Sequence, residues 1–185
     1  MRNLKTEGII IKRRNFGEAD RILTVFTKDH GKLQLKAKGV RRITSRRSSH
    51  TELLNLTSLY LYQGRNMYLL TEAIVVENFS QLKNDLLSVG FAYHICELID
   101  GLCPENQENQ KVFDLLKQTL FALKNDKNLE NIVEIIHDFE VNLLILLGFW
   151  KVSDRIPAKI VNTHSIIENL LERKLKSKQI LQLLK

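Results

Sequence analysis

The hydrophobic residues of this chain follow two different periods, and the change comes at about residue 80. Before it, apolar residues alternate with polar ones or form short β-branched runs, as in strands. After it, they recur every three or four residues, as in amphipathic helices. A chain of 185 residues is long enough for two compact units. The sequence therefore predicts an α+β protein, with a β-domain over residues 1–79 and an all-α domain over residues 80–185.

The first part contains five expected strands and no helix between them, at residues 5–12, 21–27, 32–38, 53–63 and 67–77. The third strand alternates, with one side apolar (Leu33, Leu35, Ala37) and the other polar (Lys32, Gln34, Lys36, Lys38). A small five-stranded sheet removes its exposed edges most simply by closing into a barrel. We therefore predict a five-stranded oligonucleotide-binding (OB) fold.

The second part carries apolar stripes at helical spacing, which predict a helical bundle. Its expected helices cover residues 81–102, as one helix or a broken pair, then 110–125, 129–150 and the tail from residue 165, as one or two helices, with an irregular connector at 150–164. The longest strongly apolar run, Leu143–Trp150, has eight residues. Spanning a bilayer takes about 20. We therefore expect no membrane segment, and the short apolar stretch near the N-terminus also argues against a secretory signal and for a cytoplasmic protein.

Positive charge is concentrated in the first part of the chain. Residues 1–80 hold 15 Lys and Arg against 7 Asp and Glu, whereas residues 81–185 hold 13 against 14. Clustered positive charge attracts phosphate backbones at long range. The sequence therefore predicts a polyanionic partner for the β-domain.

The densest cluster of cations follows the third strand, where no acid occurs between Ala37 and His50. Serine and threonine hydroxyls in the same stretch can donate hydrogen bonds to phosphate oxygens. We expect this loop to become ordered only on contact with nucleic acid, beside a fixed row of cations on the strands. The predicted DNA-binding residues are Lys12, Arg13, Arg14, Lys36, Lys38, Arg41, Arg42, Arg46 and Arg47. The alternative interpretation of this stretch is an idle solvated loop.

No recognisable catalytic arrangement is present, so we expect no enzyme and no cofactor. The sequence has no phosphate-binding glycine-rich motif and no nucleophile beside a base. Glu18, Asp20 and Asp29 could serve a metal-dependent nuclease, but turn positions explain them more simply. A metal site using His94 with Cys96 and Cys103 lacks a fourth ligand, so no metal is expected. The competing function is an OB-fold interaction or scaffold module, or an RNA-binding protein, that works mainly through its helices.

Three segments of the chain carry a pattern known from one protein family. They are "EADRILTVFTKDHGKLQLKAKGVRR" at residues 18–42, "FEVNLLILLGF" at 139–149 and "LKSKQIL" at 175–181. In this order they resemble the strand ending in V-F-T with its A-K-G-x-R segment, the F-E-x-x-L-L-x-x-L-G helix and the L-K-S helix start of the RecO family of bacterial recombination mediators. The resemblance spans nearly the whole chain.

This resemblance implies an OB barrel joined to a helical domain, with no catalytic turnover. It further implies binding of single- and double-stranded DNA, annealing of complementary strands coated with single-strand-binding protein, and location at the bacterial nucleoid. The implied partners are RecR, the C-terminal tail of single-strand-binding protein, and RecF and RecA indirectly. No membrane is involved.

One segment departs from the family pattern. Many members carry a four-cysteine zinc module directly after the L-G-F segment, but "GFWKVSDRIPAKIVNTH" at residues 148–164 has no cysteine. The expected helical domain therefore lacks this module.

Overall fold

A computed structural model of the protein describes residues 3–151 and 162–177. The chain divides into two compact units, one made of Met1–Asn78 and Pro104–Gln110 and the other of Phe79–Cys103 and Lys111–Lys185. Most of the expected connector and the end of the expected last helix, including Lys178, lie outside the described residues. The place of the family's zinc module, directly after Phe149, also falls largely outside them.

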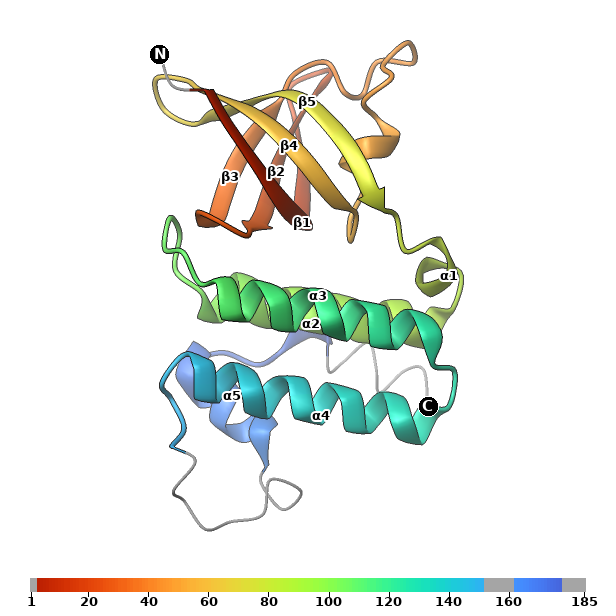
Figure 1. The fold of residues 1–185 in the computed structure, drawn as a ribbon, viewed down its shortest axis with the longest axis vertical. Helices are drawn as coiled ribbons and strands as arrows, with labels where there is room; N and C mark the ends of the chain where they lie inside the picture. Colours follow the sequence, from red (N-terminus) through yellow and green to blue (C-terminus); the bar gives the residue numbers. More distant parts are fainter. Residues whose placement is uncertain (1–2, 152–161, 178–185) are drawn as a thin grey trace. The chain divides into compact units, whose positions relative to one another are not determined.

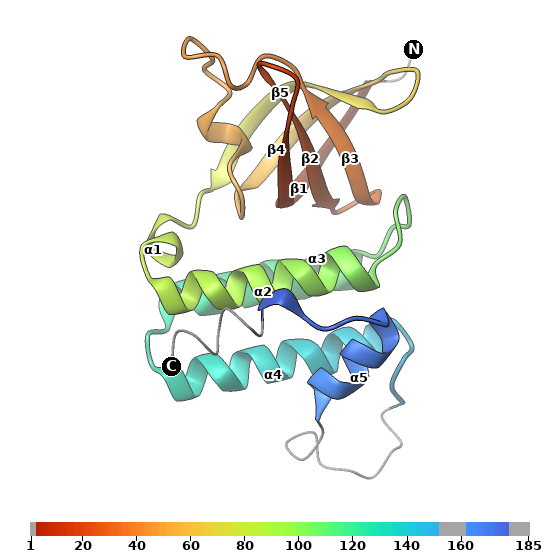
Figure 2. The same ribbon diagram turned by 180° about the vertical axis from the view of Figure 1, so that it is seen from behind.

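The first unit is a closed five-stranded barrel (Figures 1 and 2). Its strands are β1 (Asn3–Phe16), β2 (Asp20–Thr27), β3 (Gly31–Ala37), β4 (Leu56–Gln63) and β5 (Tyr68–Glu77). They are ordered β1-β2-β3-β5-β4 around the barrel, and only the β3–β5 pair is parallel. This closed barrel followed by helices confirms the predicted OB fold with a helical domain.

Strand β1 closes the barrel because it pairs with two neighbours. Its first half is antiparallel to β4 and its second half to β2, and Gly8 pairs with both Thr27 and Thr57. A Cβ atom on Gly8 would lie 2.5 Å from Cγ1 of Val25. Only glycine therefore allows β1 to pass so close to the barrel core at this point.

The barrel interior is filled by the alternating apolar residues of its strands, including Ile10, Leu23, Val25, Leu35 and Leu59. Val40, which follows β3, is also fully buried there. Lys32 differs from the expectation of a solvated lysine face, because it is only 7% exposed. The reason is the segment 104–110, which lies along the start of β3. There the Asn106 N–H donates to the Lys32 carbonyl at 2.9 Å.

The second unit is helical, with α1 (Ser80–Lys83), α2 (Leu86–Leu102), α3 (Gln110–Asn125), α4 (Leu129–Leu146) and α5 (Thr163–Leu171). The first expected helix is broken at Asp85, whose side chain caps α2 by accepting from the Ser88 N–H at 2.8 Å. Helix α4 ends four residues earlier than expected, before Gly148 with φ +79°. Within the described residues, no helix is long and apolar enough to cross a membrane.

Candidate nucleic-acid interface

A β-bulge decides which cations of β1 face outward. The pairing of β1 with β2 skips Ile11, since Ile10 lies opposite Val25 and Lys12 opposite Thr24. Without the extra residue, alternation from the buried Ile10 would turn Lys12 and Arg14 toward the barrel interior. With it, these two exposed cations lie on the outer face.

The register places two outward cations in one row across the first three strands. Arg14 pairs with Ile22, which pairs with Lys36, and directly opposite residues lie on the same face of a sheet. The outer face of strands 2 and 3 is also the surface with which OB folds bind oligonucleotides. Arg14 and Lys36 therefore lie on the face where a nucleic acid is expected.

Lys36 is held in place by two neighbours. Its ammonium lies 3.1 Å from Oδ2 of Asp20 and 4.5 Å from the centre of the Phe16 ring, which is 45% exposed. The Gly39 N–H also donates to Asp20 at 2.8 Å, and this bond, followed by that of Lys36, lowers the pKa of Asp20. Lys36 thus has a fixed position, as expected, but its charge is partly neutralised.

Arg13 contributes to the barrel rather than to the outer face. It pairs with Leu23, whose side chain is in the core, and it forms an ion pair with Glu52. Arg21 binds the other oxygen of Glu52 at 3.0 Å. Arg13 is therefore already paired at one end of the barrel.

The basic loop, residues 38–50, is bonded to the segment between β1 and β2 and is anchored at both ends. The Arg41 N–H donates to the Ala19 carbonyl at 2.9 Å, and its guanidinium donates to Gly17 at 3.1 Å. A short 3₁₀ turn, Ser49–Thr51, ends the loop, with Thr51 fully buried. Val40 and Thr51, both fully buried, thus anchor the two ends of the loop, and its ordering on contact with nucleic acid stays a prediction.

Arg47 closes a gap in the barrel. The parallel β3–β5 ladder has only two pairs, Leu35 with Tyr68 and Lys36 with Leu69. Beyond it, the Arg47 guanidinium donates to the carbonyls of Lys38 at 2.9 Å, Leu70 at 3.0 Å and Thr71 at 3.2 Å. Arg47 therefore supplies donors to backbone acceptors of β5 and of Lys38, the residue after β3, and its role is structural as well as electrostatic.

Residues of the basic loop, together with Asp20 of β2, line an open pocket of about 500 Å³. Its lining residues are Asp20, Lys38, Gly39, Arg42, Thr44, Ser45, Arg46 and Arg47. Four cations, one carboxylate and two hydroxyls thus line the pocket. This combination of cations and hydroxyl donors suits a phosphate group.

Among the described residues, the side chains of Arg14, Arg42 and Arg46 make no hydrogen bond or ion pair, and all three are exposed. They are available to an external anion without breaking a contact of the protein. Lys12 and Lys38 are also exposed. The structure thus separates the predicted set into cations that hold the barrel and cations directed to solvent.

Sequence reasoning missed two residues of this region. Glu52 neutralises Arg13 and Arg21, but it lies more than 30 positions from each of them. Arg65 is an exposed cation in the β4–β5 connection, a loop that flanks the binding face of OB folds. An isolated arginine in a turn carries little signal in a sequence.

The acids considered for a nuclease do not converge. Asp20 binds Lys36 and Gly39, Asp29 accepts from the Thr6 hydroxyl at 2.9 Å, and Glu18 is exposed. Cys96, considered as a metal ligand, is a free buried thiol. Burial, together with Asp100, raises its pKa to about 12.

Comparison with known proteins gives two family matches. The model of "Recombination protein O N terminal" matches residues 1–79, and that of "Recombination protein O C terminal" matches residues 83–150. Together they cover the barrel and most of the described helical residues.

Several curated relatives are similar over most of this chain. "DNA repair protein RecO" of Acetivibrio thermocellus is 37% identical over 150 residues, which are 80% of this chain and 59% of the relative. The proteins of the same name from Roseiflexus sp. (strain RS-1) and Symbiobacterium thermophilum are 37% and 35% identical, over 78% and 77% of this chain and 50% and 56% of their own lengths. The chain thus spans between half and three fifths of these relatives.

Proposed function

The chain belongs to the RecO family of DNA repair proteins, and on that premise we propose that it is a non-catalytic DNA-binding recombination mediator. It binds single- and double-stranded DNA and anneals complementary strands. With RecR it assists the loading of RecA onto strands coated with single-strand-binding protein. The protein acts in the bacterial cytoplasm, at the nucleoid.

The observation that carries the DNA-binding proposal is the set of cations with unpaired side chains around this pocket. Arg42 and Arg46 line this pocket, and Arg14 lies on the adjoining OB face. Such residues neutralise phosphates and release counterions, which favours binding of any sequence. Because they have no internal partner among the described residues, binding costs no ion pair of the protein.

Annealing follows from the same charges. Two complementary strands repel each other through their phosphates, and a surface that binds both backbones screens this repulsion. The bases stay free to pair because cations on the pocket and the outer face contact only the backbone. The protein therefore needs no catalytic residue to accelerate pairing.

The partner assignments rest on family membership. RecR, the acidic C-terminal tail of single-strand-binding protein and, indirectly, RecF and RecA are the proposed partners. A pull-down of the purified chain with a peptide of that acidic tail tests the second of these. Retention that is lost when the acidic residues of the peptide are replaced supports it, and no retention at low salt contradicts it.

The decisive test compares two triple variants with the same change in net charge. Arg14, Arg42 and Arg46 are replaced by Gln in the first. Lys111, Lys151 and Lys174, exposed cations of the helical unit, are replaced by Gln in the second. We expect the barrel variant to lose most strand annealing at low salt and the helical variant to retain it. Equal annealing rates would falsify the role of the barrel cations.

A further inference from the structure

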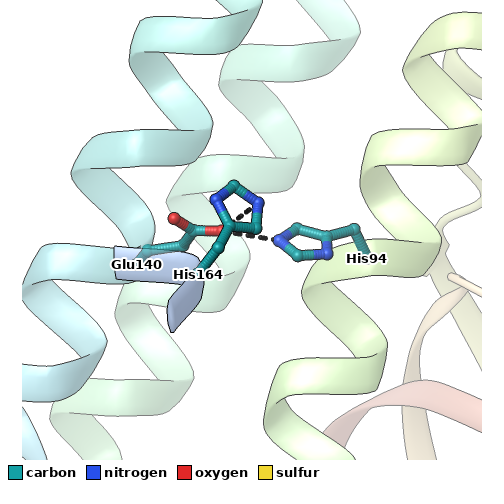
Figure 3. A group of neighbouring side chains, drawn as sticks. All are labelled: His94, Glu140 and His164. Atoms are coloured by element: carbon teal, nitrogen blue, oxygen red, sulfur yellow. Dashed lines mark hydrogen bonds and ion pairs between the residues drawn. The ribbon is translucent and has the colours of Figure 1, made fainter. Parts of the chain in front are cut away.

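A group of polar side chains is buried within the helical unit. His94 of α2 and Glu140 of α4 are both fully buried, and His164 in the first turn of α5 is 39% exposed. Nε2 of His94 lies 2.7 Å from Oε1 of Glu140, and Nε2 of His164 lies 3.4 Å from the same oxygen (Figure 3). Three potential ligand atoms from three helices thus lie within 4.8 Å of one another.

The hydrogen bonds around His94 decide where its protons are. Burial raises the pKa of Glu97, but Arg173, the Ser177 N–H and hydroxyl and the Lys176 N–H lower it to about 2. Glu97 is therefore an ionised carboxylate that only accepts. The Ser177 hydroxyl donates its single proton to Glu97 at 2.7 Å, and it must then accept from Nδ1–H of His94 at 2.8 Å.

This arrangement directs Nε2 of His94 at the carboxylate of Glu140. With Nδ1 protonated, neutral His94 has a lone pair on Nε2, and two lone pairs 2.7 Å apart need a positive charge between them. Either a second proton or a metal ion supplies it. The other oxygen of Glu140 already accepts from the Thr163 hydroxyl, so Oε1 is the oxygen left for this charge.

We propose that His94, Glu140 and His164 form a binding site for one divalent transition-metal ion, with Zn²⁺ as its occupant. Two imidazole nitrogens and one carboxylate oxygen are a ligand set that Zn²⁺ commonly takes. A proton would need only two of the three converging atoms, whereas a metal uses all of them. The Glu97–Ser177 pair holds the His94 ring by its second nitrogen, as outer partners of zinc-bound histidines do.

Metal binding requires the ligand atoms to adjust, since the two imidazole nitrogens are placed only within 4.8 Å of each other. Tetrahedral Zn²⁺ with bonds of about 2.0–2.1 Å places its ligand atoms roughly 3.3 Å apart. The His164–Glu140 separation of 3.4 Å already fits, and the His94–Glu140 separation of 2.7 Å would open on binding. Because His164 is partly exposed, water can complete the coordination.

Such an ion would join α2, α4 and α5 in a single linkage. It would use no cysteine, so it differs in chemistry from the four-cysteine module of other family members. The expected consequence is a helical unit whose stability depends on metal, because a ligand that binds only the folded state stabilises that state.

The test titrates the untagged chain, first stripped with a chelator, with Zn²⁺ in competition with a chromophoric chelator. We expect about one equivalent to bind, and affinity to fall at least ~100-fold in His164→Gln. The half-exposed position makes this substitution compatible with folding. The matched control is His137→Gln, one turn earlier on α4 and outside the cluster, which should bind like the wild type.

Thermal stability and the absorption spectrum of bound Co²⁺ test the site independently of affinity. Zn²⁺ should raise the Tm reported by fluorescence of Trp150, the single tryptophan, in wild type and in His137→Gln but not in His164→Gln. Co²⁺ bound in place of Zn²⁺ should absorb in the visible without a thiolate charge-transfer band. Equal affinities of wild type and His164→Gln, or a thiolate band from Cys96 or Cys103, would overturn the site.

Discussion

Arg47 links the basic loop to the barrel through three backbone carbonyls, so its loss should lower stability. Arg47→Ala leaves the acceptors of Lys38, Leu70 and Thr71 without their charged donor. We expect a loss of about 1–3 kcal/mol in the free energy of unfolding of the barrel. Hydrogen exchange, resolved by peptide, should show faster exchange in the basic loop and at the start of β5.

The control for this prediction is Arg46→Ala, in the same loop. Arg46 makes no hydrogen bond or ion pair with other described residues, so its removal should change stability by less than about 0.5 kcal/mol. DNA affinity should fall in both variants. Unchanged hydrogen exchange in Arg47→Ala would show that the three bonds of Arg47 to backbone carbonyls are not needed for stability.

Glu97 gives the helical unit a predictable dependence on pH. Despite burial, its pKa is lowered from 4.5 to about 2 by Arg173, Ser177 and Lys176. The folded pKa lies below the unfolded one, so the stabilisation is present above about pH 4.5 and is lost as the pH falls toward 2. Because Arg173 is partly solvated, we expect on the order of 1–2 kcal/mol from this carboxylate at pH 7.

The measurement is denaturant unfolding followed by Trp150 fluorescence, in wild type and Glu97→Gln. The variant should be less stable at pH 7, and the difference should shrink steadily between pH 4.5 and pH 2. A difference that is the same at pH 7 and pH 2.5 contradicts the assignment.

The sequence predicts which residues carry charge but not which partners they bind. The cations of the basic loop are evident from composition, and they do line the pocket. Their partners are not evident, because Glu52 lies 39 residues from Arg13 and Leu70 lies 23 from Arg47. His94 was considered with nearby cysteines, whereas its contacts are Glu140 and Ser177, 46 and 83 residues away. Tertiary folding decides which charges stay free.

Among the elements, β1 carries the sharpest test, since it must pass close to the core at Gly8. In Gly8→Ala the new Cβ would lie 2.5 Å from Cγ1 of Val25 and 3.1 Å from Cδ1 of Leu59. We expect a loss of about 1–3 kcal/mol in barrel stability from this overpacking. Val25→Ala removes the clashing methyl groups, so the double variant should be more stable than the sum of the single changes allows.

A double-mutant cycle measures this coupling, with barrel unfolding followed by the circular dichroism of its tyrosines. The coupling energy should be about 1 kcal/mol or more in the stabilising direction. Strict additivity of the two substitutions would mean that β1 shifts away from Val25 instead of being held there.

The positions of the strands and helices were largely predictable from the sequence. Which residues of a strand face the core was less so. Alternation in residues 32–38 places β3 correctly, and the apolar stripes place α2, α3 and α4. The bulge at Ile11 cannot be predicted from the sequence. Three isoleucines precede three cations, so this stretch has no apolar–polar alternation in which a change of face could be detected. Lys32 was assigned to solvent because a sequence does not reveal that residues 104–110 lie along β3.

At the scale of the whole molecule, the uneven charge predicts which unit binds DNA. The first 80 residues carry the excess of cations and the remainder is close to neutral. If the exposed cations of the barrel engage four or five phosphates, log K should fall with log salt at a slope near −3, from about −0.7 per phosphate of single-stranded DNA. Affinity should then fall roughly 60-fold between 50 and 200 mM salt.

The two charge-matched triple variants show which cations produce this salt dependence. Replacing Arg14, Arg42 and Arg46 by Gln removes three contacts, so the slope should flatten to about −1. Replacing Lys111, Lys151 and Lys174 lowers the net charge equally but should leave the slope near −3, because counterion release depends on the cations that touch phosphates and not on total charge. Fluorescence anisotropy of a labelled oligonucleotide across the salt range gives both values. A slope that flattens equally in the two variants would assign binding to the net charge of the protein and remove the case for a defined interface on the barrel.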